Sequence, residues 1–329
     1  IYLTKRYTFR KQKGYLPSTI TKGTVMKIII DLVKNWTLPL AILLGALGFP
    51  LWKHFGFFVP YFIFTMLLLT FCKIPLSELK FSSFHFLLVA LQIAGSLVVF
   101  IILKPFDILI AETATVCIMT PTGTAAAVIT RKLGGNAASL TSYMILSNLA
   151  TAIAAPLLFP FIHPMSGGIG FTEAFFIISQ KVLPLLVLPF VLALFLRRFL
   201  PVVGTRLAKW QETAFYLWGL TLMIVIAKTV DTLVNEPADK WAAIWLAVAA
   251  FLVCCLLFTA GKWLGKLYGQ RITGGQALGQ KNAVLAAWLS QTYLNPVVAV
   301  GASAYIVWQN LFNAWQLWME RRHPQKDLA

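Results

Sequence analysis

The sequence predicts an all-α membrane protein in which ten transmembrane helices form two inverted five-helix repeats. Three observations support this fold class. Of the 329 residues, 59% are hydrophobic and only 12% are charged, whereas soluble domains carry about 25% charged residues. Ten apolar runs follow one another along the chain, and a helix needs about 20 residues to cross a bilayer. Because each half holds an odd number of runs, the second half enters the membrane from the opposite side.

The first repeat is expected within residues 26–165. Its five apolar runs cover residues 28–49, 59–71, 84–103, 108–130 and 136–162. These runs do not alternate between apolar and polar residues, so helices are favoured over the strands of a barrel. The preceding residues 1–25 are polar and basic, and we interpret them as an N-terminal segment outside the fold that need not be native.

The second repeat is expected within residues 166–329. Its runs cover residues 174–195, 211–234, 241–263, 275–294 and 296–319.

The positive charges fix the predicted orientation. Of the 28 Lys and Arg residues, 22 fall in segments on one side of this topology, and only Lys53, Lys104 and Lys240 fall on the other. Positive residues gather on the cytoplasmic side of membrane proteins. We therefore predict a multi-pass protein of the cell inner membrane with both termini in the cytoplasm. The net charge of +17 is a topology signal, and nucleic acid is excluded as a partner.

The fourth and ninth spans are interrupted at corresponding positions. Pro121 removes a helical hydrogen bond and Gly123 permits a bend, and residues 274–282 are too polar to contact lipid. Paired interruptions of this kind mark a binding site near the bilayer midplane. The second half-helix after each break presents amide groups that favour an anion. The alternative is that these residues only kink the helices for packing.

Lys281 and Glu112 are the two charged residues that the sequence singles out. An ammonium group at membrane depth should face a cavity or a partner, although a lysine can also extend to the surface. Glu112 is either a proton-coupling carboxylate or a charge in an outer vestibule. No nucleophile and base pair and no nucleotide-binding motif is found, so we do not expect an enzyme.

The interrupted spans resemble the bile acid:sodium symporter family. The resemblance rests on residues 121–125, 135–136, 278–282 and 307–310, and it identifies the chain as a divergent, bacterial-type member. It implies a panel domain of helices one, two, six and seven and a core domain of helices three to five and eight to ten. It also implies a secondary active transporter in which the crossing helices four and nine hold an organic anion and two sodium ions.

The residues at the family's sodium positions depart from its pattern. The glutamate of the ninth helix falls on Ala277 and the following glutamine on Lys281, whereas the third-helix glutamine is kept as Gln92. The other sodium ligands fall on Ala126, Ala127, Leu140 and Met144. These replacements argue against sodium dependence. We expect the Lys281 ammonium to take the place of a sodium ion, linking the ninth helix to Gln92 and backbone carbonyls. The proton remains as a candidate coupling ion, and no cofactor is expected.

The predicted substrate site combines residues of both breaks and of the tenth span. It consists of Thr122, Gly123, Thr124, Ala125, Lys281, Asn282, Gln309 and Asn310. The predicted coupling region consists of Gln92, Glu112, Ala126, Ala127, Ala277 and Lys281. Two alternatives stay open: a sodium-coupled symporter whose ligands are displaced to Thr141 and Ser142, and a passive channel or sensor with the same fold. The expected partners are a small organic anion and the lipid bilayer, and the chain is either a monomer or a homodimer.

Overall fold

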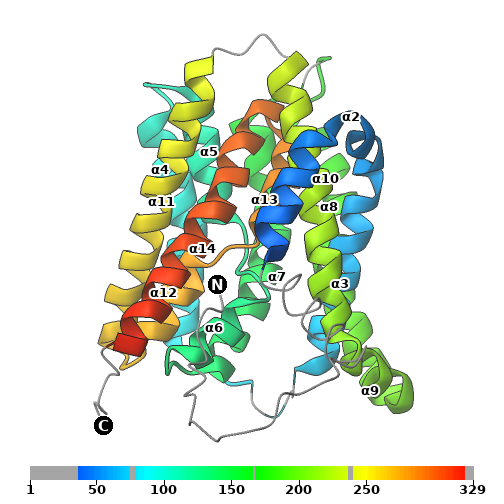
Figure 1. Ribbon diagram of the computed structural model, residues 1–329, viewed down its shortest axis with the longest axis vertical. Coiled ribbons are helices and arrows are strands. Elements are labelled where there is room, and N and C mark those ends of the chain that lie inside the picture. Colours follow the sequence, from blue (N-terminus) through cyan, green and yellow to red (C-terminus); the bar gives the residue numbers. More distant parts are fainter. Residues whose placement is uncertain (1–35, 75–76, 78, 166, 236–239, 323–329) are drawn as a thin grey trace, which may run out of the picture.

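The protein is a bundle of helices (Figure 1). The computed structural model describes residues 36–74, 77, 79–165, 167–235 and 240–322. Within these residues there is no strand beyond an isolated β-bridge, so the predicted all-α class is confirmed for this part of the chain. The predicted basic segment 1–25 lies outside the described residues, as does the beginning of the first predicted span.

Six helical segments in the described ranges are long and apolar enough to cross a membrane. They are the continuous run Phe49–Lys73, α4 (Ser83–Leu103), α7 (Ala137–Ile162), α8 (Phe171–Phe199), α10 (Gln211–Asn235) and α11 (Lys240–Leu267). The run Phe49–Lys73 joins α2 (Phe49–Trp52), the 3₁₀ helix η1 (Lys53–Phe58) and α3 (Val59–Lys73). It begins earlier than predicted because Pro50 stands in the first turn of α2, where a proline is well tolerated.

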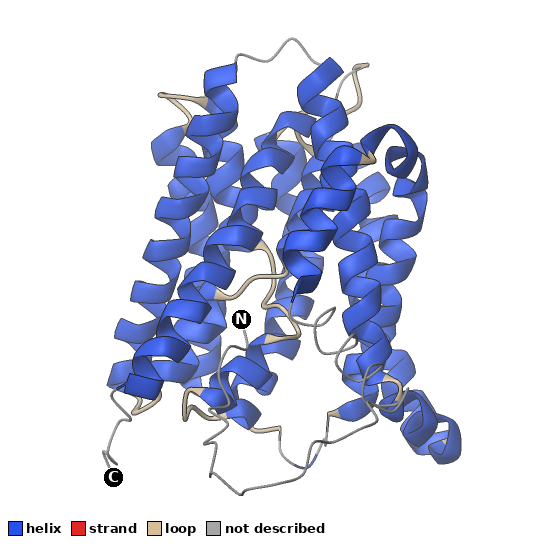
Figure 2. Ribbon diagram, in the orientation of Figure 1, coloured by secondary structure: helices blue, strands red, loops and turns tan. Residues whose placement is uncertain are grey.

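Two further predicted spans are interrupted. The fourth consists of α5 (Ile108–Met119) and α6 (Ala126–Lys132), and the ninth of α12 (Arg271–Gly279) and α13 (Ala283–Tyr293). Figure 2 shows non-helical segments in the middle of the bundle, between helices, in addition to the loops at its two ends. The first interruption falls at the predicted residues. Of residues 274–282, which were predicted to interrupt the ninth span, only 280–282 lie outside a helix, because α12 continues to Gly279. This span begins at Arg271 rather than Gly275.

The remaining helices complete the bundle. They are Trp36–Leu47, α9 (Pro201–Lys209), η3 (Pro296–Val298) and α14 (Ala299–Arg322). The sequence analysis did not predict α9, which begins at Pro201 directly after α8 and packs against α3 and α8. It lies at the lower right edge of the bundle in Figure 1.

Glycines allow α11 and α12 to touch through their backbones. A Cβ atom on Gly261 would lie 2.1 Å from Gly274 O, and one on Gly274 would lie 2.2 Å from Gly261 O. Small residues at such positions let membrane helices approach closely when lipid provides no hydrophobic force between them. The first half of the ninth span is therefore held rigidly against α11.

The outer surface of the helices suits lipid. Large apolar side chains such as Ile101 and Ile102 on α4, and Leu252 and Leu256 on α11, are more than half exposed. A water-soluble protein would rarely leave such long helical surfaces apolar. Together with the apolar spanning helices, this surface identifies a membrane-embedded protein.

Basic residues gather at one end of the bundle. They occupy the last turns of several helices: Lys73, Arg131, Lys132, Arg197, Arg198, Arg206, Lys209, Lys266, Arg321 and Arg322. This basic end is the lower end in Figure 1, where α6, α9, α12 and the end of α14 lie.

Candidate functional site

The break in the fourth span follows from Pro121. Thr120, the preceding residue, has φ −59° and ψ 143°, because a proline disfavours helical geometry in the residue before it. α5 therefore ends at Met119, and its last carbonyl groups lack the amide donors that a continuing helix would supply. Inside a membrane these carbonyls must find donors within the protein.

The break in the ninth span contains no proline and is held by side chains. Lys281 N–H donates to Gln309 Oε1 (2.8 Å), and Gln309 Nε2 donates to Lys281 O (3.1 Å). Asn282 then begins α13, because its side chain accepts a hydrogen bond from Leu285 N–H (3.3 Å). A single amide side chain from α14 thus replaces helical hydrogen bonds that the break removes.

The two breaks cross as a short antiparallel pair. Thr122 and Lys281 form the isolated β-bridge. A Cβ atom on Gly123 would lie only 3.0 Å from Lys281 O, so a glycine suits this close approach. The flanking backbone bonds run from Gly123 N–H to Gln280 O (3.0 Å) and from Asn282 N–H to Pro121 O (2.8 Å).

The side chains of the two bridge residues each donate a hydrogen bond to a backbone carbonyl of the other interrupted span. Thr122 Oγ1 donates to Ala277 O (2.7 Å), and Lys281 Nζ donates to Ile118 O (2.7 Å). Each acceptor lies four residues before the other bridge residue, in the last turn of a half-helix that ends at the break. Each side chain therefore satisfies a carbonyl group at the end of the opposite half-helix.

The backbone amides of the bridge residues are also matched. Thr122 N–H donates to Ser147 Oγ (3.2 Å) on α7, and Lys281 N–H donates to Gln309 Oε1 (2.8 Å) on α14. In uninterrupted helices these amides would donate to Ile118 O and Ala277 O. The crossing thus replaces hydrogen bonds within one helix by bonds between different helices.

Gln92 lies in a buried polar network behind the crossing. Its Nε2 donates to Met119 O (2.6 Å), and its Oε1 accepts from Tyr143 OH (2.7 Å) and Ser147 Oγ (2.8 Å). Thr151 Oγ1 donates to the same Met119 O (2.9 Å). The network therefore joins α4 and α7 to the end of α5.

The Lys281 ammonium is buried and directed at a backbone carbonyl. The residue is only 2% exposed, so the alternative of extension to the surface is wrong for this structure. Its acceptor, Ile118 O, lies at the C-terminal end of α5, where a helix carries partial negative charge. Gln92 binds the neighbouring carbonyl of Met119. Lys281 and Gln92 thus act on adjacent carbonyls rather than on each other.

A cavity of about 310 Å³ lies against the crossing. Seven predicted substrate-binding residues line it: Gly123, Thr124, Ala125, Lys281, Asn282, Gln309 and Asn310. Thr122 does not line it, because its hydroxyl is turned to Ala277 O and the residue is buried. The facing wall comes from α3 and α10 and includes Ile63, Met66, Leu67, Thr70, Gln211, Ala214, Phe215 and Trp218.

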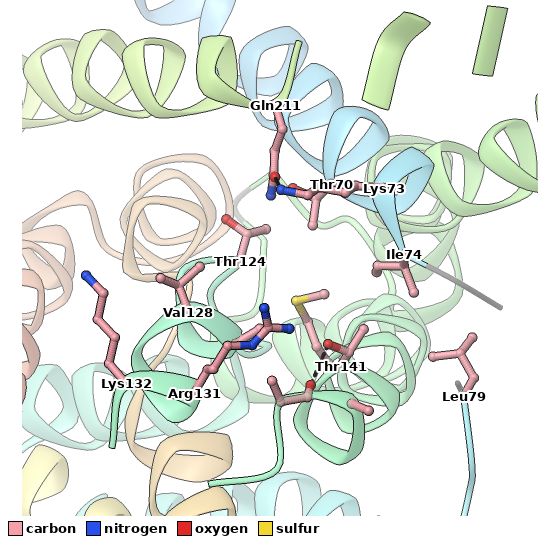
Figure 3. A pocket seen from close by; sticks show the side chains of 14 residues that line it. Thr70, Lys73, Ile74, Leu79, Thr124, Val128, Arg131, Lys132, Thr141 and Gln211 are labelled. Carbon is pink, nitrogen blue, oxygen red and sulfur yellow. Dashed lines mark hydrogen bonds between the residues drawn. The ribbon is translucent and has the colours of Figure 1, made fainter. Parts of the chain in front are cut away.

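A second cavity of about 300 Å³ continues toward the basic end (Figure 3). It shares Thr70, Thr124, Val128 and Gln211 with the first. We call it the basic vestibule. Its other lining residues are Lys73, Ile74, Leu79, Ala127, Arg131, Lys132, Ala137, Ala138, Thr141 and Met144.

The residues at the expected sodium positions offer almost no oxygen ligands. Ala126, Ala277, Leu140 and Met144 are buried and have side chains without oxygen. Gln92 Oε1 already accepts two hydroxyl groups. Hard cations are held by several oxygen ligands at once, so this set of residues does not fit a sodium ion.

Glu112 lies on α5, away from the cavity at the crossing. It is 1% exposed, its Oε2 accepts from Asn295 N–H (3.2 Å), and its Oε1 is 2.9 Å from His163 Nδ1. Burial therefore removes this carboxylate from solvent, and its role as a coupling carboxylate or an outer-vestibule charge stays a prediction. In this structure Glu112 joins the end of α7 to the turn before η3.

Three residues of α7 that hold the crossing were not expected from the sequence. Tyr143, Ser147 and Thr151 all bind Gln92 or Met119 O. Their spacing of four residues places them on one helix face, and that spacing is the signal that could have found them. Taken singly, serine and threonine in membrane helices bond to their own helix too often to be informative.

No protein-family model matches the chain, and no curated protein is similar to it. Its function is therefore inferred from the crossing and the two cavities.

Proposed function

We propose that the protein is a secondary active transporter of a small organic anion and that the cavity at the crossing is its substrate site. The observation that carries this proposal is the crossing of two interrupted helices beside a cavity of about 310 Å³. Non-helical backbone at membrane depth is tolerated where it is buried or lines a cavity. In secondary transporters such breaks form the substrate site.

The charges around the cavities favour an anionic substrate. Lys73, Arg131, Lys132 and Lys281 line the two cavities, and within the described ranges none of the lining residues is Asp or Glu. In addition, Ala283, in the first turn of α13, lines the cavity at the crossing. The N-terminus of a helix carries partial positive charge, which also favours an anion there.

Two inverted repeats explain the matched contacts at the crossing. A two-fold axis in the membrane plane would exchange Thr122 with Lys281 and Ser147 with Gln309, whose bonds correspond. The same axis would exchange Tyr143 with Tyr305. Tyr143 precedes Ser147 by four residues and Tyr305 precedes Gln309 by four, and both hydroxyl groups form hydrogen bonds near the breaks. We infer ten spans in repeats covering 26–165 and 166–329.

The position of the cavity suggests two moving bodies. We assign Trp36–Leu47, Phe49–Lys73, α8 and α10 to a panel domain, and α4 to α7 and α11 to α14 to a core domain. The cavity lies between α3 and α10 on one side and the two breaks on the other. Relative movement of panel and core would then expose the site to each side of the membrane in turn.

The basic end supports an orientation in the cell inner membrane. Positive residues mark the cytoplasmic side, so we place the basic end, the basic vestibule and both chain termini in the cytoplasm. The conformation described here is then open to the inside.

The coupling ion is more consistent with a proton than with sodium. The sodium-coupled alternative placed ligands at Thr141 and Ser142. Ser142 is buried, and its Oγ already accepts from Lys80 N–H (3.1 Å), so it has little capacity left for a cation. Thr141 lines the basic vestibule beside Arg131 and Lys132, whose charges repel a cation. Lys281 already supplies a positive charge beside the crossing. Because the Lys281 side chain is the ionisable group at the crossing itself and the residue also lines the cavity there, we propose Lys281 as the group that gains and loses the coupled proton.

Ligand binding followed by counterflow tests the transport proposal. Purified protein is first screened by thermal shift against small carboxylates, sulfonates and neutral amides, with and without sodium. A stabilising anion is then loaded into proteoliposomes, and uptake of the labelled anion is measured. We expect saturable counterflow that is unchanged when choline replaces sodium. Flux that does not saturate would indicate a channel, and binding without flux would indicate a sensor.

A further inference from the structure

We propose that Arg131, in the basic vestibule, binds the carboxylate of the transported anion. This inference rests on the proposed function and adds the residue that recognises the charge of the substrate. Arg131 belongs to the last turn of α6, the half-helix that follows the first break. Arg131 was not among the predicted substrate-site residues, because its position in the sequence is that of an ordinary residue in a cytoplasmic loop.

The side chain of Arg131 extends into the vestibule. Figure 3 shows its guanidinium group between Val128 and Thr141, within the ring of lining residues. Among the described residues, the guanidinium has no hydrogen-bond or ion-pair partner. A guanidinium that faces a cavity without an acidic lining residue is available to an incoming anion.

The other three cations that line the cavities have partners within the protein. Lys281 Nζ donates to Ile118 O (2.7 Å) and is buried. Lys73 Nζ donates to Gln211 Oε1, and Lys132 has a partner of its own. Among the described cations that line the cavities, Arg131 is therefore the one whose side chain remains for the substrate in this conformation.

The chemistry of the vestibule fits an organic carboxylate. A guanidinium group can donate two parallel hydrogen bonds to the two oxygens of a carboxylate. The hydroxyl groups of Thr124 and Thr141 line the same space. Apolar side chains of Ile74, Leu79, Val128 and Met144 form much of the remaining wall, so an apolar body can lie between Arg131 and the crossing.

The position of Arg131 also determines whether the panel domain or the core domain binds the carboxylate of the substrate. Arg131 follows the first break by a single short helix, and α6 packs against α7 and α12. In the proposed division it belongs to the core, whereas Lys73 and Gln211 belong to the panel. The carboxylate would thus remain on the same body as the crossing while panel and core move.

Binding of an isosteric acid and amide tests the role of Arg131. The probes are 1-naphthaleneacetate and 1-naphthaleneacetamide, and their affinities for the full chain in nanodiscs are measured by isothermal titration. We expect the wild-type protein to prefer the acid by about tenfold to a hundredfold, the range expected for a hydrogen bond between charged groups. Arg131→Gln should abolish this preference, and Arg131→Lys should retain part of it, because lysine keeps the charge but not the planar fork.

Arg198→Gln is the matched control. Arg198 lies in the last turn of α8 at the same basic end, but it does not line either cavity. Its variant should therefore bind both probes as the wild-type protein does. A wild-type protein without preference for the acid, or an Arg131→Gln variant that keeps the preference, would overturn the proposal.

A second test measures the rate of a thiol reaction in the vestibule and does not depend on the affinity of any ligand. Thr141→Cys places a thiol in the vestibule, and its rates of reaction with the anionic sulfonatoethyl and the cationic trimethylammonioethyl methanethiosulfonate are compared. Reaction of the chain without this cysteine is subtracted. We expect Arg131→Gln to lower the anion-to-cation rate ratio at least threefold, and Arg198→Gln to leave it unchanged. An equal ratio with and without Arg131 would contradict the proposal.

The two proposals fail separately. If acid binding depends on Arg131 but no counterflow occurs, the anion site stands and the transporter assignment falls. If counterflow occurs and acid binding is independent of Arg131, the transporter assignment stands and the role of Arg131 falls.

Discussion

Lys281 shows how a charged side chain is accommodated at membrane depth. Its ammonium reaches the negative end of α5, and its own backbone N–H and C=O groups are both bound by Gln309. An ammonium at the centre of a bilayer costs a few kcal/mol when it is unpaired. The carbonyl of Ile118 and the burial of the surrounding segments offset part of that cost without a bound counter-ion.

Lys281→Gln should separate coupling from transport. A glutamine removes the charge that can gain and lose a proton, but it can still donate to Ile118 O. We expect counterflow to persist and uptake driven by a pH gradient to fall at least tenfold, measured in the same proteoliposomes. Proton-driven uptake that is unaffected by this substitution would contradict the proposed role of Lys281.

Thr122→Val should destabilise the crossing. Valine keeps the shape of threonine but removes the bond to Ala277 O, which leaves a buried carbonyl without its side-chain donor. The expected loss is about 1–3 kcal/mol, seen as a lower midpoint of thermal unfolding. Thr221→Val is the control, because the Thr221 hydroxyl is also buried but donates to Leu217 O in its own helix. Equal losses in the two variants would refute a special role for the bond across the breaks.

At this scale the sequence predicted which residues meet but not how they are bonded. Gly123, Asn282 and Gln309 were expected at one cavity, and they line it. The turn of Thr122 away from the cavity depends on the carbonyl of Ala277, which belongs to a helix far along the chain. Such a tertiary contact leaves no local signal in the sequence.

At the scale of the elements, the two breaks differ in how visible they are in the sequence. Pro121 ends α5 by a local rule, so the first break can be predicted with confidence from the residue alone. The second break depends on Gln309, which comes from another helix. It was predicted only from polarity, and the start of α12 at Arg271 was accordingly placed too late.

Gly261→Ala should weaken the contact between α11 and α12. The added Cβ would lie 2.1 Å from Gly274 O, so the helices must separate. Overpacking of this kind costs about 1–3 kcal/mol, and we expect a lower thermal unfolding midpoint. Gly95→Ala in α4 is the matched control, because its Cβ meets no atom closer than 3.8 Å. That variant should unfold at an equal or higher temperature, since alanine favours a helix by about 0.5–1 kcal/mol. A midpoint for Gly261→Ala as high as that of Gly95→Ala would show that the contact tolerates a side chain.

At the scale of the whole molecule, the side opposite the basic end is closed by contacts between α10, α13 and α14. Gln291 Nε2 donates to Val225 O (3.3 Å) and Thr229 Oγ1 (3.2 Å), and Thr229 Oγ1 lies 3.2 Å from Ser303 Oγ. In the proposed division α10 belongs to the panel, whereas α13 and α14 belong to the core. Alternating access would require these contacts to open.

A disulfide across this seal should therefore stop transport. We expect oxidised Thr229→Cys/Ser303→Cys to lose counterflow and to recover it after reduction. Each single cysteine variant, treated in the same way, should remain active. The native cysteines are free, and Cys72, Cys117 and Cys254 are buried, so oxidation alone should have little effect. Full counterflow in the crosslinked protein would exclude a movement of α10 relative to α14.

The all-α class and the six long apolar helices of the described residues were predictable, because apolar runs depend only on the membrane. The ten-span arrangement stays a prediction. Which face of each helix is turned toward the cavity was not predictable from the sequence. Trp218 on α10 lines the cavity although nothing in its neighbourhood distinguishes it from other tryptophans. The helix α9 and the helical start of Phe49–Lys73 were missed because their residues are not apolar throughout.

The reciprocal bonds of Thr122 and Lys281 have a consequence for how this protein can evolve. Each residue completes a helix end that belongs to the other half of the chain, so a mutation at either position is felt at both. The two positions should therefore change in concert. An exchange of their side chains, Thr122→Lys together with Lys281→Thr, should be tolerated better than either change alone, and thermal unfolding of the three variants would reveal this dependence as epistasis between the two halves of the chain.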